Sequence, residues 1–212
     1  MAVFIKELAR YFNQSIFYSR IIFTISAFLF LSLEVCAQEK IYILPLGEID
    51  EEVIQNLKNK LPEVFSLEVE VYNPKKIPLS SFNPKRRQYH SSLILEELSK
   101  DKLKGYTLAV CDVDLYVEGL NFVFGEANPF NKICIISLTR LKQEYYGLPK
   151  DNNLFLLRSL KEAVHELGHV FGISHCANPK CVMHFSNSLL DTDRKDFNFC
   201  NLCKRKIKNV HR

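Results

Sequence analysis

Residues 165–175 read HELGHVFGISH, and the interpretation of the whole chain starts from this stretch. On a helix, residues four positions apart lie on one face, so His165 and His169 can direct their imidazoles toward one metal ion. Glu166 lies beside them, where a carboxylate can act on a water molecule next to the metal. The spacing therefore predicts a helix that carries a catalytic zinc site.

Gly172 and His175 extend this pattern and make a chance occurrence improbable. Glycine adopts a positive φ without a steric penalty, so Gly172 can end the helix and return the chain, bringing His175 round as a third ligand. Three neutral histidines leave the fourth zinc position to water, whose pKa zinc lowers to about 7. We expect Glu166 to act as the general base that takes the proton of this water.

Four cysteines follow in two close pairs, Cys176 with Cys181 and Cys200 with Cys203. Such pairs can each hold one side of a tetrahedral ion, and four thiolates with no open position are typical of a structural zinc site. Two disulfides are the alternative, because the chain carries a possible export signal. The ligand spacing favours zinc, which gives two zinc ions per chain in all.

From His165 to Cys203 the chain resembles the archaemetzincins, zinc peptidases of the metzincin group, through the pattern HExxHxxGxxHCx4CxM followed by CxxC. The resemblance implies a catalytic zinc on the three histidines, a glutamate general base, and a structural zinc on the four cysteines. It also places Met183 in a turn beneath the metal, as a soft apolar floor. The spacer from Met183 to Cys200 holds 16 residues, about one fewer than the family pattern, a difference that a loop tolerates.

The resemblance covers residues 40–207 and includes Cys111–Tyr116 and Asn121–Ala127, although only the metal motifs are highly specific. It implies an α/β, single-domain metzincin-like fold. That fold has a mixed twisted sheet with an antiparallel edge strand, an active-site helix and a C-terminal segment held by zinc. We assign residues 38–212 to this domain.

The body of the chain supports an α/β organisation independently of the family. Short runs rich in β-branched and aromatic residues predict five strands, at Ile41–Leu46, Leu67–Tyr72, Tyr106–Cys111, Phe122–Gly125 and Ile133–Leu138. A helix from Asp50 to Lys60, ended by Pro62, and another from Gln88 to Lys102 separate the first three. Two β-α-β steps imply parallel pairing.

The turn at Asn128–Asn131 predicts a hairpin and therefore an antiparallel edge. Such an edge could accept an extended peptide by strand addition, so we expect Phe122–Ala127 near the substrate. The active-site helix should begin near Asp151 or Asn152 and run to about Val170. A short helix is expected from Thr192, with the cysteines largely on loops.

The first 37 residues have the pattern of a secretory signal peptide. Basic residues precede an apolar run from Ile21 to Leu33, which is short for a bilayer span of roughly 20 residues. Val35 and Ala37 are acceptable positions before a cleavage site. We expect an exported protein, periplasmic or secreted. One alternative is an uncleaved leader that anchors the protein in the membrane. Another is a misplaced start codon and a cytoplasmic protein.

Several other residues are weaker candidates. His184 could contact the cleft, although a lone histidine on a turn is more often simply exposed. Asp112 and Asp114 could orient a loop, and we expect no role in chemistry for them. Cys111 and Cys134 lie in predicted strands, where a buried thiol is the ordinary outcome. Tyr145 and Tyr146 could offer an oxyanion donor, but nothing in the spacing places them near the site.

Charge gives no reason to expect a nucleic-acid partner. The net charge is +4, and five basic residues lie in the tail after Cys203. A short basic tail is usually a solvated chain end. We expect a peptide or protein substrate, and no membrane partner beyond the possible leader.

Together these patterns predict a zinc-dependent peptidase in which Glu166 deprotonates water that attacks a peptide carbonyl. Endopeptidase and aminopeptidase activity both fit. One alternative is a zinc-stabilised module that binds peptides without cutting them, although a closed metal site would normally supply a fourth protein ligand. Another is an amidase that acts on a non-peptide amide.

Overall fold

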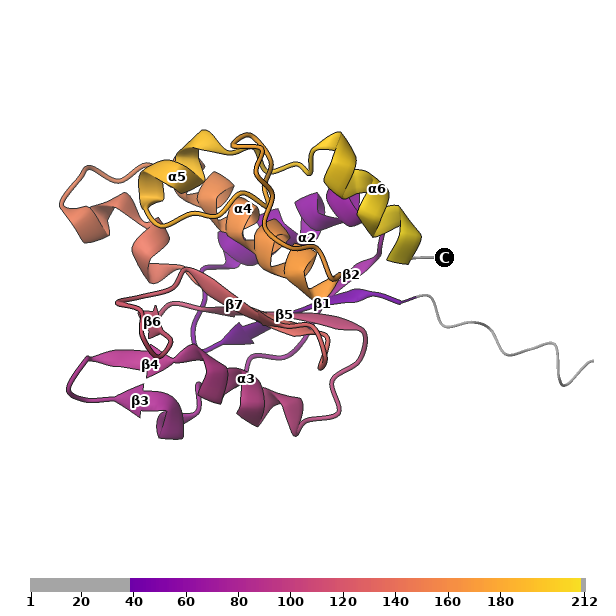
Figure 1. Ribbon diagram of the computed structural model, residues 1–212. Helices are drawn as coiled ribbons and strands as arrows, with labels where there is room; N and C mark the ends of the chain where they lie inside the picture. The colour runs from indigo at the N-terminus through magenta and orange to yellow at the C-terminus, as the bar shows by residue number, and fades with distance from the viewer. Residues whose placement is uncertain (1–38, 211–212) are drawn as a thin grey trace, which may run out of the picture. The chain divides into compact units, whose positions relative to one another are not determined.

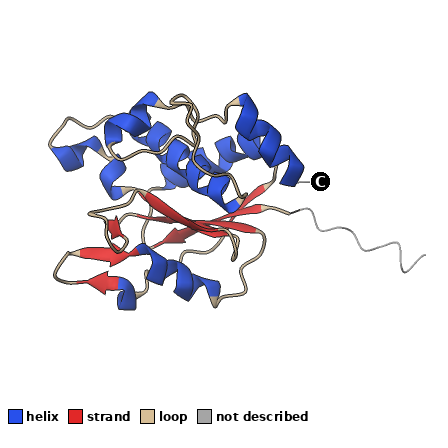
Figure 2. Ribbon diagram, viewed as in Figure 1, coloured by secondary structure: helices blue, strands red, loops and turns tan. Residues whose placement is uncertain are grey.

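The structure is a computed structural model that describes residues 39–210, so the predicted leader at residues 1–37 lies outside the described residues. A five-stranded mixed sheet forms the centre of this unit (Figures 1 and 2). Its order is β2-β1-β5-β8-β7, and the first four strands run parallel. Their bounds are Val69–Val71 for β2, Ile41–Leu46 for β1, Tyr106–Cys111 for β5 and Ile133–Ser137 for β8.

The remaining strand, β7 (Gly125–Asn128), pairs antiparallel with β8 and leaves its other side unpaired in the sheet. The register places Gly125 opposite Ile136 and Asn128 opposite Ile133. The predictions of parallel pairing, of the hairpin and of an antiparallel edge strand are confirmed. The edge that could receive a peptide is therefore β7.

Helices cover both faces of the sheet. In Figure 1, α2, α4, α5 and α6 lie above the sheet and α3 lies below it. The bounds of the helices are Glu51–Phe65 for α2, Ser91–Ser99 for α3, Asn152–Val170 for α4, Leu189–Arg194 for α5 and Asn201–Val210 for α6. Three short 3₁₀ turns complete the set, at Leu79–Ser81 (η1), Thr139–Leu141 (η2) and Gln143–Tyr146 (η3).

Two apolar cores result, because alternate strand residues point to opposite faces. Ile43 and Val110 belong to the core beneath α2 and α4, whereas Leu44 and Ala109 belong to the core above α3. Every residue of β5 and β8 is buried, as expected for strands covered on both faces. This rigid sheet supports helix α4, which packs on β7 and β8.

Several predicted boundaries were wrong. Helix α2 continues past Pro62, because the apolar contacts of the buried Leu61 and Phe65 compensate the lost hydrogen bond. The strand predicted from Phe122 begins only at Gly125, and the residues before it leave the sheet. The predicted helix from Gln88 begins at Ser91, and the one from Thr192 begins at Leu189.

A second sheet, of three strands, was not predicted. Its strands are β3 (Phe82–Asn83), β4 (Gln88–His90) and β6 (Leu115–Tyr116), in the order β3-β4-β6. Helix α6 was also missed, so Cys203 lies on a helix rather than on a loop. Among residues 39–210, none of the helices combines the length and the hydrophobicity that a membrane span requires.

Candidate active site and metal centres

Helix α4 presents the histidines that were predicted as ligands. Asp151 is its N-cap, with the side chain accepting a hydrogen bond from the Leu154 amide at 2.9 Å, as predicted. The helix ends at Val170, and Gly172 follows with a φ of 76°. This left-handed residue returns the chain, so that His175 reaches the face that carries His165 and His169.

The three Nε2 atoms converge on one point. His169 Nε2 lies 3.1 Å from His165 Nε2 and 3.2 Å from His175 Nε2. Ligand nitrogens about 2.0 to 2.1 Å from a tetrahedral zinc lie roughly 3.3 Å apart, close to this spacing. Three lone pairs packed this closely repel one another unless a cation lies between them, so the donor set fits a zinc ion.

Backbone carbonyls fix the imidazoles in the ligating tautomer. His165 Nδ1 donates to the Val182 carbonyl and His169 Nδ1 to the Ile173 carbonyl, each at 2.8 Å. Because a carbonyl only accepts, both rings must carry their proton on Nδ1 and expose the Nε2 lone pair. Burial lowers the pKa of His165 to about 3 and also lowers the pKa of His169 and His175, which favours neutral, metal-binding rings.

Glu166 lies beside the histidines at the base of a cleft of about 240 Å³. Burial, followed by the nearby Glu162 carboxylate, raises the pKa of Glu166 well above its usual range. A Cβ atom on Gly125 would lie 2.6 Å from Glu166 Cγ, so the edge strand approaches the carboxylate as closely as only glycine permits. The cleft therefore lies between the helix and β7, as predicted for Phe122–Ala127.

Met183 is fully buried under the active helix, as the resemblance implies. A Cβ atom on Gly168 would lie 2.4 Å from its sulfur, so the methionine packs directly on the helix backbone. Two neighbours also approach the cleft: the Phe185 ring lies 5.1 Å from the His175 ring, and Ser186 Oγ is buried without a hydrogen-bond partner among residues 39–210. His184 instead bonds the Cys176 carbonyl through Nδ1 at 2.9 Å.

The four cysteines gather into a second cluster. Their sulfurs all lie within 4.8 Å of one another, and Cys176 Sγ lies 3.9 Å from Cys200 Sγ. A disulfide requires about 2.05 Å, whereas sulfurs about 2.3 Å from a tetrahedral zinc lie roughly 3.8 Å apart. The thiols are free, so the geometry fits a metal centre and not the disulfide alternative. A backbone N–H from Cys203 helps lower the pKa of Cys200 to about 7.

Sequence reasoning missed a set of buried charges behind the histidines. Lys195 Nζ lies 3.0 Å from Glu162 Oε1, with side chains only 0% and 3% exposed. Arg158 forms a bidentate pair with Asp193, with both N to O distances at 2.7 Å. These pairs attach the α5 segment to the active helix. Their partners are more than 30 residues apart, so no local pattern reveals them.

The weaker candidates lie away from the histidines. Cys111 and Cys134 are fully buried, as expected. Asp114 holds Arg140 and thereby orients a loop, and Asp112 bonds Thr139 at 3.2 Å. Tyr145 and Tyr146 form part of η3. There Tyr145 lies against the Arg140 guanidinium and not in the cleft.

Comparison with known proteins identifies the family. The sequence profile of peptidase family M54 matches residues 19–209. Archaemetzincin of Methanocaldococcus jannaschii is 44% identical over 170 residues, which cover 80% of this chain and 93% of that protein. The chain belongs to peptidase family M54, the archaemetzincins. Archaemetzincin of Pyrococcus abyssi is 46% identical over 181 residues, covering 81% of this chain and 96% of its own.

Solved archaemetzincin structures share the fold. The Archaeoglobus fulgidus protein, solved in complex with malonate, has a TM-score of 0.70 and 43% identity, and covers 79% of this chain and 99% of its own. The Methanopyrus kandleri protein has a TM-score of 0.74 and 33% identity, with 84% and 98% covered. The predictions of an archaemetzincin, of its α/β fold and of a zinc-dependent peptidase are confirmed.

Proposed function

We propose that the three histidines on and after α4 hold the catalytic zinc of this archaemetzincin and that Glu166 is its general base. The observation that carries the proposal is the convergence of three Nε2 atoms beside a buried carboxylate, at the floor of a cleft. When bound, zinc supplies a Lewis acid, which lowers the pKa of water and polarises a peptide carbonyl. The cleft and the free edge of β7 then position the substrate.

Glu166 does the proton transfer in this proposal. It takes a proton from the water that attacks the carbonyl and delivers that proton to the nitrogen of the departing amine. A carboxyl in a dry site holds a proton well, because burial raises its pKa. The contact with Gly125 limits its movement, so the carboxylate stays between the substrate strand and the helix.

The second proposed zinc lies on the four cysteines, which leave no position open for substrate. Its role is to order the residues between Cys176 and Cys203, which include helix α5, the start of α6 and the turn around Met183. We assign residues 38–212 to this zinc-dependent domain, with peptides or proteins as substrate. The role of residues 1–37 as an export leader stays a prediction.

The test combines metal analysis with turnover. Protein purified without added metal should contain two zinc ions per chain, falling to one in a double variant with His165→Ala and His169→Ala. Glu166→Gln should keep both ions and the capacity to bind peptide, while its kcat falls by about 10² to 10⁴-fold. Unchanged turnover in Glu166→Gln would refute its role as base. No turnover by the wild type, with binding intact, would favour the binding module.

A further inference from the structure

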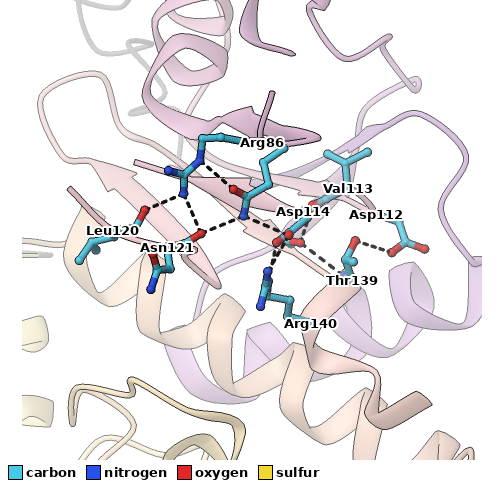
Figure 3. Close-up of polar contacts among 10 residues, drawn as sticks. Arg86, Asp112, Val113, Asp114, Leu120, Asn121, Thr139 and Arg140 are labelled. Carbon is cyan, nitrogen blue, oxygen red and sulfur yellow. Dashed lines mark hydrogen bonds and ion pairs between the residues drawn. The ribbon is translucent and has the colours of Figure 1, made fainter. Parts of the chain in front are cut away.

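A hollow lined by three arginines lies next to the cleft, and neither metal centre uses it. Its volume is about 550 Å³, and Arg86, Arg87 and Arg140 line it together with Asn121 and Asp114. In Figure 3, Arg86 and Arg140 approach from opposite sides, with Asn121 and Asp114 between them. Three arginines and a single carboxylate-bearing residue, Asp114, thus line the hollow.

Arg86 is held in place without being neutralised. Its Nη2 donates to the carbonyls of Leu120 and Asn121, each at 2.9 Å, and its Nε donates to Gln88 Oε1 at 2.9 Å. Its guanidinium also lies 4.3 Å from the centre of the Tyr116 ring. Among the residues that the structure describes, no carboxylate forms an ion pair with Arg86, so a fixed positive charge faces the hollow.

The other two arginines differ in how much of their charge is balanced. Arg140 forms a bidentate pair with Asp114, at 2.6 and 2.8 Å, and its guanidinium lies 4.3 Å from the centre of the Phe122 ring. Arg87 is exposed, and its side chain makes no hydrogen bond or ion pair within residues 39–210. The lining therefore carries an excess of positive charge that suits an anion.

The wall between hollow and cleft is the segment Leu120–Phe122. Leu120 and Phe122 line the cleft, while Asn121 lines the hollow. Arg86 holds the wall by the carbonyls of Leu120 and Asn121, and the Phe122 ring lies against Arg140. A ligand that leaves the cleft along this segment therefore meets the arginines.

Strand direction tells which end of a peptide arrives there. A peptide added to β7 forms the more stable ladder when it runs antiparallel, so its C-terminal part leaves the strand at Gly125. The Val123 amide already donates to the Leu115 carbonyl, so the ladder ends there and the peptide continues past the segment Leu120–Phe122 toward Asn121. Asn121 precedes Gly125 by four residues, which span at most about 14 Å. Glu166 lies against Gly125, so the hollow receives residues up to about four positions beyond the bond to be cut.

We propose that this hollow is a carboxylate-binding subsite for the C-terminal part of the substrate. The arginines select peptides with a negative charge within about four residues after the cleaved bond, by the planar donor geometry that guanidinium offers a carboxylate. That charge comes either from the C-terminal carboxylate or from an aspartate or glutamate side chain. The inference rests on the proposed function, since it assumes a peptide along β7.

The test uses three peptides that share one cleavable sequence. The first ends in a free carboxylate four residues after the cleaved bond, the second is its amide, and the third is the amide with glutamate as its last residue. Equilibrium binding is measured on zinc-loaded Glu166→Gln protein, and kcat and KM on wild-type protein. We expect either acidic peptide to bind roughly tenfold more tightly than the neutral amide, through KM and not kcat.

Two variants and one control separate charge from structure. Arg87→Gln removes a charge that forms no ion pair or hydrogen bond within residues 39–210, and Arg86→Gln removes the fixed one. Each should bring the preference for the acidic peptide down to about threefold or less. Lys85→Gln removes a neighbouring exposed charge outside the hollow and should leave the preference unchanged.

Equal binding of acidic and neutral peptides by the parent protein would overturn the inference. An unchanged preference in both arginine variants would also overturn it, as would an equal loss in Lys85→Gln, which would indicate general charge attraction. The acidic peptide that binds more tightly identifies the source of the carboxylate. Failure of every peptide to be cleaved would count against the proposed function, while the binding measurements would still decide on the subsite.

Discussion

Replacement of Lys195 by methionine should destabilise this domain more than replacement of any exposed lysine. The side chains of Lys195 and Glu162 are 0% and 3% exposed, and their charged atoms lie 3.0 Å apart. Methionine fills a similar volume but leaves the Glu162 carboxylate with one hydrogen-bond partner among residues 39–210, the Thr192 hydroxyl at 3.2 Å. Breaking a buried pair by removal of one partner costs about 3 to 5 kcal/mol.

This loss is large compared with a total stability of about 5 to 15 kcal/mol for a folded domain. Urea unfolding of the wild type and of Lys195→Met, at pH 7 with equal zinc, measures it directly. The double variant Glu162→Gln with Lys195→Met removes both charges and should recover most of the loss, because a neutral pair no longer leaves a buried charge. Lys60→Met, at an exposed pair, is the control and should change stability by less than about 1 kcal/mol.

The pH dependence gives a second check with a defined sign. Burial acts to raise the pKa of Glu162, but Lys195, His165 and Thr192 outweigh it, and the pKa is lowered. In the wild type, ionised Glu162 therefore stabilises the folded state. This stabilisation is fully present above the unfolded pKa of about 4.3 and is lost as pH falls through the folded pKa. Without Lys195, burial dominates and the pKa rises, so the deficit of the variant should shrink from pH 7 to pH 5.

A loss below about 1 kcal/mol in Lys195→Met would refute this reasoning. A double variant no more stable than the single one would also do so, because the cost would then come from packing and not from the unpaired carboxylate. Both outcomes would show that the unpaired Glu162 carboxylate costs little, because water or a rearranged polar group then solvates it. The wild-type measurement at each pH serves as the reference, so loss of metal at low pH affects both proteins alike.

Two further predictions concern glycines that contact the site. Gly168→Ala places a Cβ atom 2.4 Å from the Met183 sulfur. Although alanine normally stabilises a helix, this overlap should lower the free energy of unfolding by about 1 to 3 kcal/mol, measured by thermal unfolding. A raised melting temperature would contradict this. Gly125→Ala places a Cβ atom 2.6 Å from Glu166 Cγ and 2.7 Å from a backbone oxygen, and a displacement of about 1 Å should lower kcat by up to about 10²-fold. Its zinc content should not change, and full activity would show that Glu166 can shift at little cost.

The parts of the fold that follow from local pattern were predictable. The N-cap at Asp151, the helix to Val170 and the hairpin around residues 128–131 depend on neighbours within a few positions, and the structure has each of them. The strands β3, β4 and β6 have only two or three residues each, too few to show a period of two. The predicted end of α2 at Pro62 was wrong because tertiary contacts overcame the tendency of proline to end a helix.

The candidate metal ligands stand out in the sequence because zinc demands fixed residue types at fixed spacing, whereas the surroundings of the site do not. On α4 the apolar Leu157 is 37% exposed, while the charged residues Lys161 and Glu162 are buried. Their partners lie near residue 193, and only the folded chain brings them together. Gly125 did carry a signal, since an isolated glycine in a strand often marks a close approach.

The histidine cluster and the cysteine cluster are connected through the turn around Met183. The Val182 carbonyl accepts the hydrogen bond that fixes His165, and the Val182 amide donates to Asn198, between the cysteine pairs. Cys176 donates its amide to the Met183 carbonyl. A metal ion on the cysteines would therefore help to order the carbonyl that sets the His165 tautomer. His165 and His169 lie on a helix that the sheet already supports, whereas His175 directly precedes Cys176, so a metal ion on the histidines would also help to order the start of the cysteine segment.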